Sequence, residues 1–317
     1  MSLRILDGEC FGLLGVNGAG KTTSIGMLTG EFPPTRGDAW VGGFSIATQL
    51  PRVREQLGYC PQEDPLLERM TGRELLTMFA RLKNLDEAAL PGLVQSLIEQ
   101  VTLTPFADRV CGAYSGGNKR KLSLAIALVG DPAVCFLDEP SSGMDPQSRR
   151  HVWDVIAAER SRRSLVLTTH SMAECEALCS RVGVMAAGRL RCLGGQQHLK
   201  SKYGGGYTLE LRVGGEAAGG GGGGGRGGGG EEAHEGVCRL FPGARLIEHV
   251  AGRSKYELPS GVQLHDIFEQ MEGAKSALGV LDYSATQPSL ESVFLAIAGS
   301  AAADAALSRA PPPASAA

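Results

Sequence analysis

The residues of this sequence best suited to chemistry begin with a glycine-rich stretch at positions 15–23, which reads G-V-N-G-A-G-K-T-T. Gly15, Gly20, Lys21 and Thr22 have the G-x-x-x-x-G-K-[ST] spacing of a phosphate-binding loop, with an apolar segment before it and a helix-like segment after it. Backbone N–H groups at such a helix start bind phosphate oxygens, the lysine adds positive charge, and the Thr22 hydroxyl is the expected Mg²⁺ ligand. The stretch predicts a nucleotide site made by Asn17, Gly18, Gly20, Lys21, Thr22 and Thr23. A plain glycine-rich turn with a solvated lysine is disfavoured because every required position and both flanks agree.

A pair of carboxylates follows a short apolar run further along the chain. Residues 134–137 read V-C-F-L and run directly into Asp138 and Glu139. A strand here would place Asp138 in the Mg²⁺ shell, and Glu139 one residue beyond, where it could activate a water for attack on a γ-phosphate. Taken alone, the pair is equally consistent with carboxylates that solvate a strand end.

A second anion site is predicted where Ser115, Gly116 and Gly117 begin a helix. A basic run at 119–121 follows, and the local pattern alone favours the alternative of a plain helix cap with solvated basic residues. The segment stands 23 residues before Asp138 in a chain with a phosphate loop, which is the arrangement that ABC-type ATPases show.

The sequence resembles the nucleotide-binding domain of an ABC transporter, and its form Y-S-G-G-N-K-R-K-L-S resembles subfamily A, whose members mostly move lipids. The motifs that carry the resemblance stand in the family's order: the phosphate loop, Y-C-P-Q-E-D at 59–64, the segment from Ser115, F-L-D-E-P at 136–140, S-S-G-M-D-P at 141–146 and T-T-H-S at 168–171. The resemblance covers nearly the whole chain.

The resemblance implies roles for three more residues. Gln62 would contact Mg²⁺ or the attacking water, Asp145 the opposite subunit, and His170 the γ-phosphate. Singly, each has an ordinary explanation as a turn residue, a helix N-cap or a polar strand end. Their joint occurrence favours a site with Glu139, His170 and Gln62 as catalytic residues. Thr22, Gln62 and Asp138 would be the metal ligands, and Ser115, Gly116, Gly117 and Asp145 would contact ATP from the second cassette.

Composition limits the alternatives. A length of 317 residues suits one large or two modest domains, and a net charge of −3 gives no electrostatic reason to expect nucleic acid. No signal peptide and no run of about 18 apolar residues is present, so we expect the chain not to span a membrane itself. The resemblance instead implies docking to transmembrane domains at the cytoplasmic face of a membrane.

Eight cysteines without C-x-x-C spacing predict free thiols in a reducing compartment. A metal site formed by Cys175, Cys179 and His170 is conceivable. A pair of half-buried thiols is favoured because no further ligand is evident.

Alternation of strand-like and helix-like segments predicts an α/β P-loop NTPase core at 1–195, with a mainly parallel sheet and helices on both faces. Short antiparallel strands are expected at 37–46, where we interpret Trp40 as a packing residue. A helical subdomain is expected at about 64–132. It contains a capping box formed by Thr71 and Glu74, with Leu75, Phe79 and Leu82 on one helical face.

Residues 196–299 predict a small α+β domain that resembles the regulatory domain of subfamily A, through motifs at 199–209, 241–244 and 289–295. A generic α+β appendage is the alternative. Strand-like segments at 207–213, 240–247, 255–258 and 280–283 and helices at 264–272 and 290–298 are expected. Two segments are expected to be disordered: a polyglycine insertion at 214–230 and a tail at 300–317.

One departure from the family concerns the adenine. The family's first strand supplies an aromatic residue that stacks on the base, and this chain begins 14 residues before Gly15, so we expect that strand to be absent. Base stacking contributes about 1–3 kcal/mol, which corresponds to roughly tenfold or more in ATP affinity.

The leading hypothesis is an ATP-hydrolysing motor in which two cassettes sandwich ATP and drive membrane domains that handle a lipid. Two alternatives stay open. One is a module that regulates or interacts without hydrolysing ATP. The other is a soluble ABC-type ATPase acting on nucleic acid or ribosomes, against which stands the lack of a long heptad region or second cassette.

Overall fold

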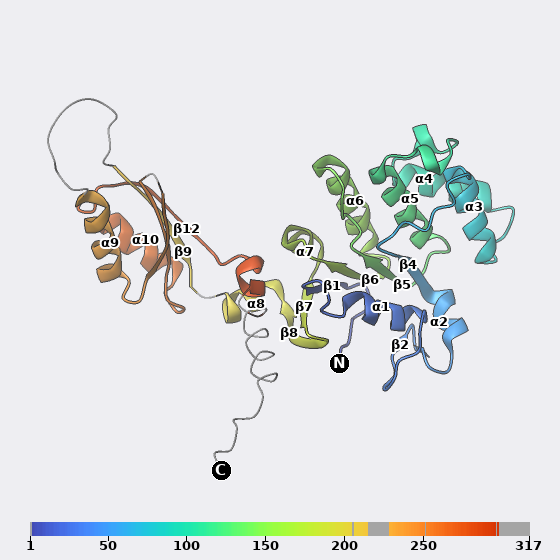
Figure 1. The fold of residues 1–317 in the computed structure, drawn as a ribbon, viewed down its shortest axis with the longest axis horizontal. Helices are drawn as coiled ribbons and strands as arrows, with labels where there is room; N and C mark the ends of the chain where they lie inside the picture. The colour runs from blue at the N-terminus through green and yellow to red at the C-terminus, as the bar shows by residue number, and fades with distance from the viewer. Residues whose placement is uncertain (1, 205, 215–227, 251, 296, 298–317) are drawn as a thin grey trace, which may run out of the picture. The chain divides into compact units, whose positions relative to one another are not determined.

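A computed structural model describes residues 2–204, 206–214, 228–250, 252–295 and 297 (Figure 1). These residues form two compact units, one up to Gln196 and one from Gln197 to Ile297. The tail expected at 300–317 and residues 215–227 of the expected polyglycine loop lie outside the described residues.

The first unit is built on a six-stranded sheet with the order β4-β5-β6-β1-β7-β8. The strands are β1 (Cys10–Gly15), β4 (Leu57–Cys60), β5 (Val134–Asp138), β6 (Ser164–Thr169), β7 (Arg181–Ala186) and β8 (Arg189–Gly195). All neighbouring pairs are parallel except β7 and β8, which form an antiparallel hairpin. Every residue of β1 and β6 is buried, as expected for a parallel sheet covered on both faces.

Helices cover this sheet from two sides, with α1 on the side opposite α6 and α7 (Figure 1). Their bounds are α1 (Lys21–Thr29), α2 (Leu50–Gln56), α6 (Pro146–Glu159) and α7 (Met172–Leu178). Apolar side chains of the sheet and of α1, among them Phe11, Ile25, Phe136 and Val166, form a continuous core. The predicted P-loop NTPase class of fold is confirmed.

A two-stranded hairpin, β2 (Trp40–Val41) and β3 (Phe44–Ser45), lies beside this core, as expected. The interpretation of Trp40 as a packing residue was wrong, because the residue is 68% exposed. Val41 and Ile46 enter the core instead. Successive residues of a strand point to opposite faces, so burying Val41 turns Trp40 outward.

The helical subdomain contains α3 (Gly72–Leu82), α4 (Leu90–Gln100) and α5 (Gly116–Leu128), with 3-10 turns at Thr104–Phe106 and Cys111–Ala113. The capping box is confirmed: Thr71 Oγ1 accepts from the Glu74 N–H at 3.2 Å, and Glu74 Oε2 accepts from the Thr71 N–H at 2.8 Å. The predicted apolar face was partly wrong. Leu75 is buried, but Leu82, the last residue of α3, is 73% exposed. Helical periodicity gives the face on which Leu82 lies but does not show whether another element covers that end of the helix.

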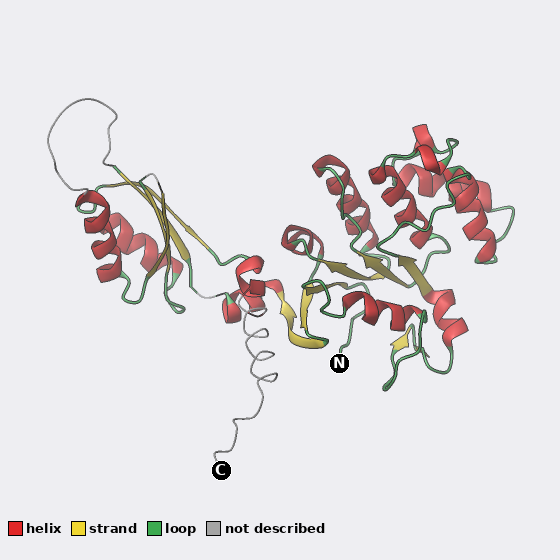
Figure 2. Ribbon diagram, viewed as in Figure 1, coloured by secondary structure: helices red, strands yellow, loops and turns green. Residues whose placement is uncertain are grey.

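The second unit contains a four-stranded antiparallel sheet with the order β10-β11-β9-β12. Its elements are α8 (Gln196–Tyr203), β9 (Thr208–Val213), α9 (Gly228–Leu240), β10 (Arg245–Val250), β11 (Arg253–Glu257), α10 (Leu264–Ala274) and β12 (Val280–Thr286). Helices α9 and α10 lie on the same face of the sheet (Figure 2). Residues 290–295 and 297 are helical, within the helix expected at 290–298.

Helix α9 was missed by the sequence analysis, which extended the loop to 230 and expected a strand from 240. The helix ends at Leu240, and the strand begins at Arg245. Ala233, Val237 and Phe241 are buried at a spacing of four residues, which is the helical signal that the glycine run obscured. Across the described residues, the helices are all too short or too polar to cross a membrane.

Candidate nucleotide site

Four parallel strands deliver the predicted site residues to one edge of the sheet. Strand β1 leads into the phosphate loop, β4 ends two residues before Gln62, β5 ends at Asp138, and β6 ends one residue before His170. Because the strands β4, β5, β6 and β1 are adjacent and parallel, their carboxyl ends meet at the same edge. Residues separated by more than 150 positions in the sequence are thereby brought into one neighbourhood.

The phosphate loop has the backbone geometry of an anion cradle. Gly18 and Gly20 adopt positive φ angles of 78° and 101°, a region that glycine enters without steric cost. Gly20 is the N-cap of α1, so the first N–H groups of this helix are free of intrahelical partners. Lys21 is buried, and its Nζ donates to the carbonyl of Gly15 at 2.8 Å. Thr22 is exposed at the helix start, so its hydroxyl is accessible to a ligand.

The carboxylate of Glu139 lies between the other two predicted catalytic residues. Gln62 Nε2 donates to Glu139 Oε2 at 3.4 Å, and His170 Nδ1 lies 3.3 Å from Glu139 Oε1. Glu139 is 8% exposed, whereas the side chain of His170 is 62% exposed. The structure therefore brings the side chains of Gln62 and His170 to the carboxylate of Glu139.

The backbone of Glu139 is strained. Its φ angle is +50°, in the left-handed region that a non-glycine residue enters at a cost of about 1–3 kcal/mol. The N–H of Glu139 donates to the carbonyl of Thr168 at 3.1 Å. Such strain persists only where the surrounding structure enforces it, and it is concentrated at functional sites.

Asp138 is completely buried beside this carboxylate. The Thr168 hydroxyl donates to Asp138 Oδ1, while Oδ2 has no hydrogen-bond partner among the described residues. A buried carboxylate oxygen without a partner is costly, and a cation removes that cost. Carboxylate, hydroxyl and amide oxygens are ligands that Mg²⁺ accepts, so Asp138, Thr22 and Gln62 fit this ion.

Ser115 and Asp145 occupy separate helix starts. Ser115 is the N-cap of α5, and its hydroxyl accepts from the Asn118 N–H at 3.3 Å. Asp145 caps α6, and hydrogen bonds from Ser148 and then Gln147 lower the pKa of its carboxyl. Ser115, Gly116 and Asp145 are exposed, and Gly117 is half-buried. Within the described chain, no hydrogen bond joins Ser115 or Asp145 to the phosphate loop.

Arg120 is a buried residue beside the site that sequence reasoning missed. Solvated basic residues at 119–121 were the alternative that the local pattern favoured, but Arg120 is only 4% exposed. Its guanidinium donates to the carbonyls of Pro61, Gln62, Asp138, Glu139 and Pro140 and to the carboxylate of Asp64. Helical periodicity gave no signal for it, because all residues of α5 from Leu122 to Leu128 are buried, so no face of this helix is distinguished.

A buried carboxylate was also missed behind the site. Ser141 Oγ donates to Glu174 Oε1 at 2.6 Å, and Trp153 Nε1 donates to the same oxygen at 3.1 Å. Together they anchor the loop that follows Glu139 to α6 and α7. A hollow of about 280 Å³ opens beside this loop, lined by Glu139, Ser141, Ser142, Gly143, Arg149, Thr169, His170, Ser171 and Glu174.

The thiols play no visible part in this site. All eight cysteines are free, as expected. Cys175 and Cys179 are fully buried rather than half-buried, and interaction with Cys10 and then Cys175 raises the pKa of Cys179. In the part of the chain that the structure describes, no three His, Cys, Asp or Glu side chains are grouped to hold a metal ion.

Comparison with known families assigns both units. Residues 1–142 match the ABC transporter family, and residues 204–287 match the ABCA1-like C-terminal R1 regulatory domain. The chain carries an ABC transporter cassette followed by an R1 regulatory domain. The predicted resemblance to subfamily A is confirmed.

Similar proteins include transporters named for phospholipids. The cassette and R1 domain together are 49% identical over 300 residues to the phospholipid-transporting ATPase ABCA3 of Rattus norvegicus, covering 94% of this chain and 17% of that protein. They are 46% identical over 298 residues to the human phospholipid-transporting ATPase ABCA7, covering 93% of this chain and 13% of that protein. This chain therefore spans about a sixth of the length of the first relative and about an eighth of the second.

Two solved structures share the cassette fold. One is the dimeric ATP-binding cassette MJ0796 in a post-hydrolysis state bound to ADP and Pi, with a TM-score of 0.57, 19% identity and coverage of 61% of this chain and 88% of that one. The other is the ATP-binding subunit of an ABC transporter, with a TM-score of 0.59, 27% identity and coverage of 64% and 85%.

Proposed function

We propose that this chain binds ATP with Mg²⁺ and hydrolyses it as a motor cassette of a subfamily A ABC transporter. The observation that carries the proposal is the carboxylate of Glu139, held by Gln62 and His170 at the sheet edge where the phosphate loop also begins. A buried base beside a phosphate cradle supports hydrolysis rather than nucleotide binding alone.

The predicted site residues would have three roles: binding the phosphates, holding Mg²⁺ and activating the attacking water. Asn17, Gly18, Gly20, Lys21, Thr22 and Thr23 would bind the phosphates through backbone N–H groups, hydroxyls and the lysine charge. Thr22, Gln62 and Asp138 would hold Mg²⁺, which neutralises phosphate charge when bound. Glu139 would orient a water and accept its proton, and the exposed His170 would contact the γ-phosphate.

A second cassette is the proposed partner. Ser115, Gly116 and Asp145 are exposed and lack a hydrogen bond to the phosphate loop within the described chain, which supports a role on the nucleotide of another cassette. The positively charged N-terminal ends of helices from the two cassettes would both face the phosphates of ATP, which would hold the cassettes together. After hydrolysis this attraction would weaken and the cassettes would separate.

The remaining assignments follow from the family. Transmembrane domains would receive the motion of the cassettes, the substrate would be a lipid, and the chain would lie at the cytoplasmic face of a membrane. The names of the relatives support the choice of lipid. We assign residues 1–195 to the cassette, with a helical subdomain at about 64–132, and residues 196–299 to the regulatory domain.

A comparison of two lysines tests the nucleotide site. Lys21 and Lys83 both donate to main-chain carbonyls, at 2.8 Å from Gly15 O and 2.7 Å from Leu57 O, but only Lys21 lies in the phosphate loop. In the full chain, Lys21→Ala should weaken ATP–Mg²⁺ binding by at least about tenfold, and Lys83→Ala should leave the affinity within about twofold. Calorimetric titration and phosphate release measure both variants.

The outcomes separate the alternatives. Equal affinity of the wild type and Lys21→Ala would reject the nucleotide site. ATP binding without phosphate release, even when a second cassette is added, would favour a regulatory module. Binding to nucleic acid that weakens steeply with salt would favour the soluble ATPase.

A further inference from the structure

The guanidinium of Arg120 joins three segments that are distant in the sequence. Arg120 lies in α5, and its donors reach residues 61–64, which follow β4, and residues 138–140, where β5 ends. Five of its six acceptors are main-chain carbonyls, and the sixth is the carboxylate of Asp64. The side chain therefore binds the backbone that carries Gln62 and Glu139, not their side chains.

The charge of Arg120 is balanced inside the protein. Its NH1 lies 3.0 Å from Asp64 Oδ1, in a pair whose side chains are 5% and 22% exposed. Asp64 Oδ1 also accepts from the Ser123 hydroxyl at 2.7 Å, one turn further along α5. A buried and paired arginine contacting this many groups fixes their relative positions, because its planar fork has five N–H donors in fixed directions.

One of these groups is the strained residue. The NH2 of Arg120 donates to the carbonyl of Glu139 at 3.0 Å, while the N–H of Glu139 donates to Thr168 O at 3.1 Å. These two bonds hold the peptide groups on both sides of the Glu139 Cα, where φ is +50°. Among the described residues, the Glu139 carbonyl accepts from Arg120 and from the Ser142 N–H at 3.1 Å, so loss of Arg120 would leave only the bond from Ser142.

We propose that Arg120 is a positioning residue for hydrolysis. It holds Glu139 in its left-handed conformation and keeps Gln62 beside it, so the proton-accepting carboxylate faces the site. This inference rests on the proposed function of Glu139. Arg120 is five residues along α5 from Ser115, about 7.5 Å of helix rise.

The position is specific to arginine. Lysine has a point charge and three donors on one nitrogen, which cannot reach the separate carbonyls that bind Nε, Nη1 and Nη2 around the edge of the guanidinium plane. We therefore expect Arg120→Lys and Arg120→Gln to lower kcat by roughly 10- to 100-fold, since small displacements of a reacting group have effects of this size. The affinity for ATP measured without Mg²⁺ should stay within about threefold of the wild type, because the hydrogen-bond acceptors of Arg120 lie at residues 61–64 and 138–140 and not in the phosphate loop.

Arg163 supplies the matched control. It is a second buried arginine of the same unit, paired with Glu159 at 2.6 Å and Asp131 at 2.7 Å, away from the strand ends that carry the site. Arg163→Lys should lower the melting temperature in the same way as Arg120→Lys but leave kcat unchanged. If both variants lose kcat in proportion to stability, Arg120 has only a structural role and the proposal is wrong.

Hydrogen exchange of the full chain tests the positioning without relying on activity. Arg120→Gln should speed exchange of the backbone amides of Asp138, Glu139 and residues 62–64 by at least about tenfold relative to the wild type, while Arg163→Lys should leave these amides unchanged. Unchanged exchange in Arg120→Gln would overturn the proposal. Faster exchange in a chain whose wild type releases no phosphate would retain the positioning role and reject the proposed function instead.

Discussion

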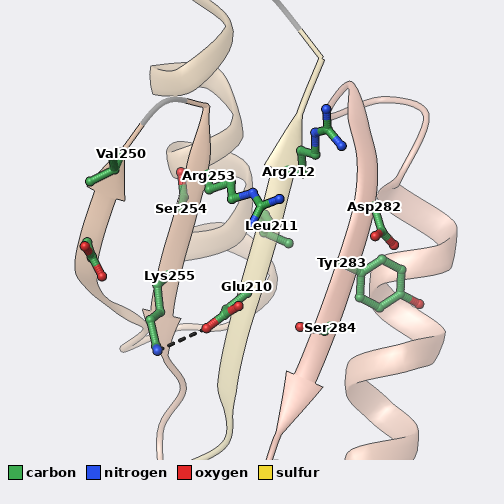
Figure 3. Close-up of a pocket in the computed structure, with 11 residues that line it drawn as sticks. Glu210, Leu211, Arg212, Val250, Arg253, Ser254, Lys255, Asp282, Tyr283 and Ser284 are labelled. Carbon is green, nitrogen blue, oxygen red and sulfur yellow. Dashed lines mark ion pairs between the residues drawn. The ribbon is translucent and has the colours of Figure 1, made fainter.

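The two units of this protein each contain a hollow, and the smaller one has the features of a reaction site. The hollow beside Glu139 has a volume of about 280 Å³, whereas the one on the open face of the second unit's sheet has about 490 Å³ (Figure 3). The first is bordered by a buried, strained residue at the ends of parallel strands. The second is lined by side chains along antiparallel strands, including Glu210 and Lys255, which form an ion pair at 3.0 Å.

The two hollows differ in whether their polar groups are exposed to water or buried and hydrogen-bonded to other elements. Along β9, Leu209 and Leu211 are buried while Glu210 and Arg212 are exposed, so the charged residues of the larger hollow simply form the solvated side of a sheet. Around Glu139, polar groups are removed from water and held by residues of other elements. Burial and cross-linking of polar groups indicate chemistry better than the size of a hollow does.

The largest effect on activity is expected when the carboxylate of Glu139 is replaced by an amide. Glu139→Gln keeps the size of the side chain but replaces one acceptor oxygen with an amide NH₂ and cannot accept a proton, so kcat should fall by at least about 100-fold while ATP affinity changes by less than about threefold. Steady-state phosphate release and nucleotide titration measure the two quantities. Glu99→Gln, on the exposed side of α4, is the control and should change neither. Normal turnover by Glu139→Gln would remove Glu139 from the mechanism.

The next effect concerns stability in the first unit. Glu159 is 3% exposed, pairs with Arg163 and accepts from Gln100 Nε2 at 2.7 Å. Glu159→Gln should lower the free energy of unfolding by about 3 kcal/mol, because the buried guanidinium of Arg163 loses its negatively charged partner. Urea denaturation monitored by circular dichroism gives the value. A loss below about 0.5 kcal/mol would mean that Asp131 alone compensates Arg163.

A smaller difference is expected between the cysteines of the two units in how fast they react with an alkylating reagent. Seven cysteines, all in the first unit, are buried, while Cys238 in the second is half-buried. Burial raises the pKa of Cys60 to about 12 and of Cys135 to about 11, so both thiols stay protonated and unreactive at neutral pH. Iodoacetamide at pH 8 should label Cys238 at least about tenfold faster than any other cysteine, as read by mass spectrometry of the folded chain. Early labelling of Cys60 or Cys135 would contradict this order.

The smallest effect is predicted on the open sheet face. Lys255 and Glu210 are 41% and 52% exposed, so water and salt screen their attraction. Glu210→Gln should change the free energy of unfolding by less than about 1 kcal/mol and leave ATP affinity unchanged. A loss comparable to that of Glu159→Gln would show that the open face is more strongly coupled to the fold than its exposure suggests.

Local sequence was sufficient for much of the fold and of the candidate site. The phosphate-loop spacing, the capping box of α3 and the strand before Asp138 each depend on residues within about ten positions. The prediction was wrong where packing decides. Trp40 and Leu82 are exposed although their patterns indicated packing, and α9 was hidden by the glycine run before it.

The sequence by itself determined which residue types are available for nucleotide chemistry and in which elements they lie, because spacing along strands, turns and helices is a local property. Only the tertiary structure decided that Gln62 and His170 meet at Glu139, that Glu139 is strained, and that Arg120 holds its backbone. The parallel strands that bring these residues to one edge are joined by long crossovers. Their order, and the burial of one arginine among three basic residues, depend on contacts between distant parts of the chain that no local pattern specifies.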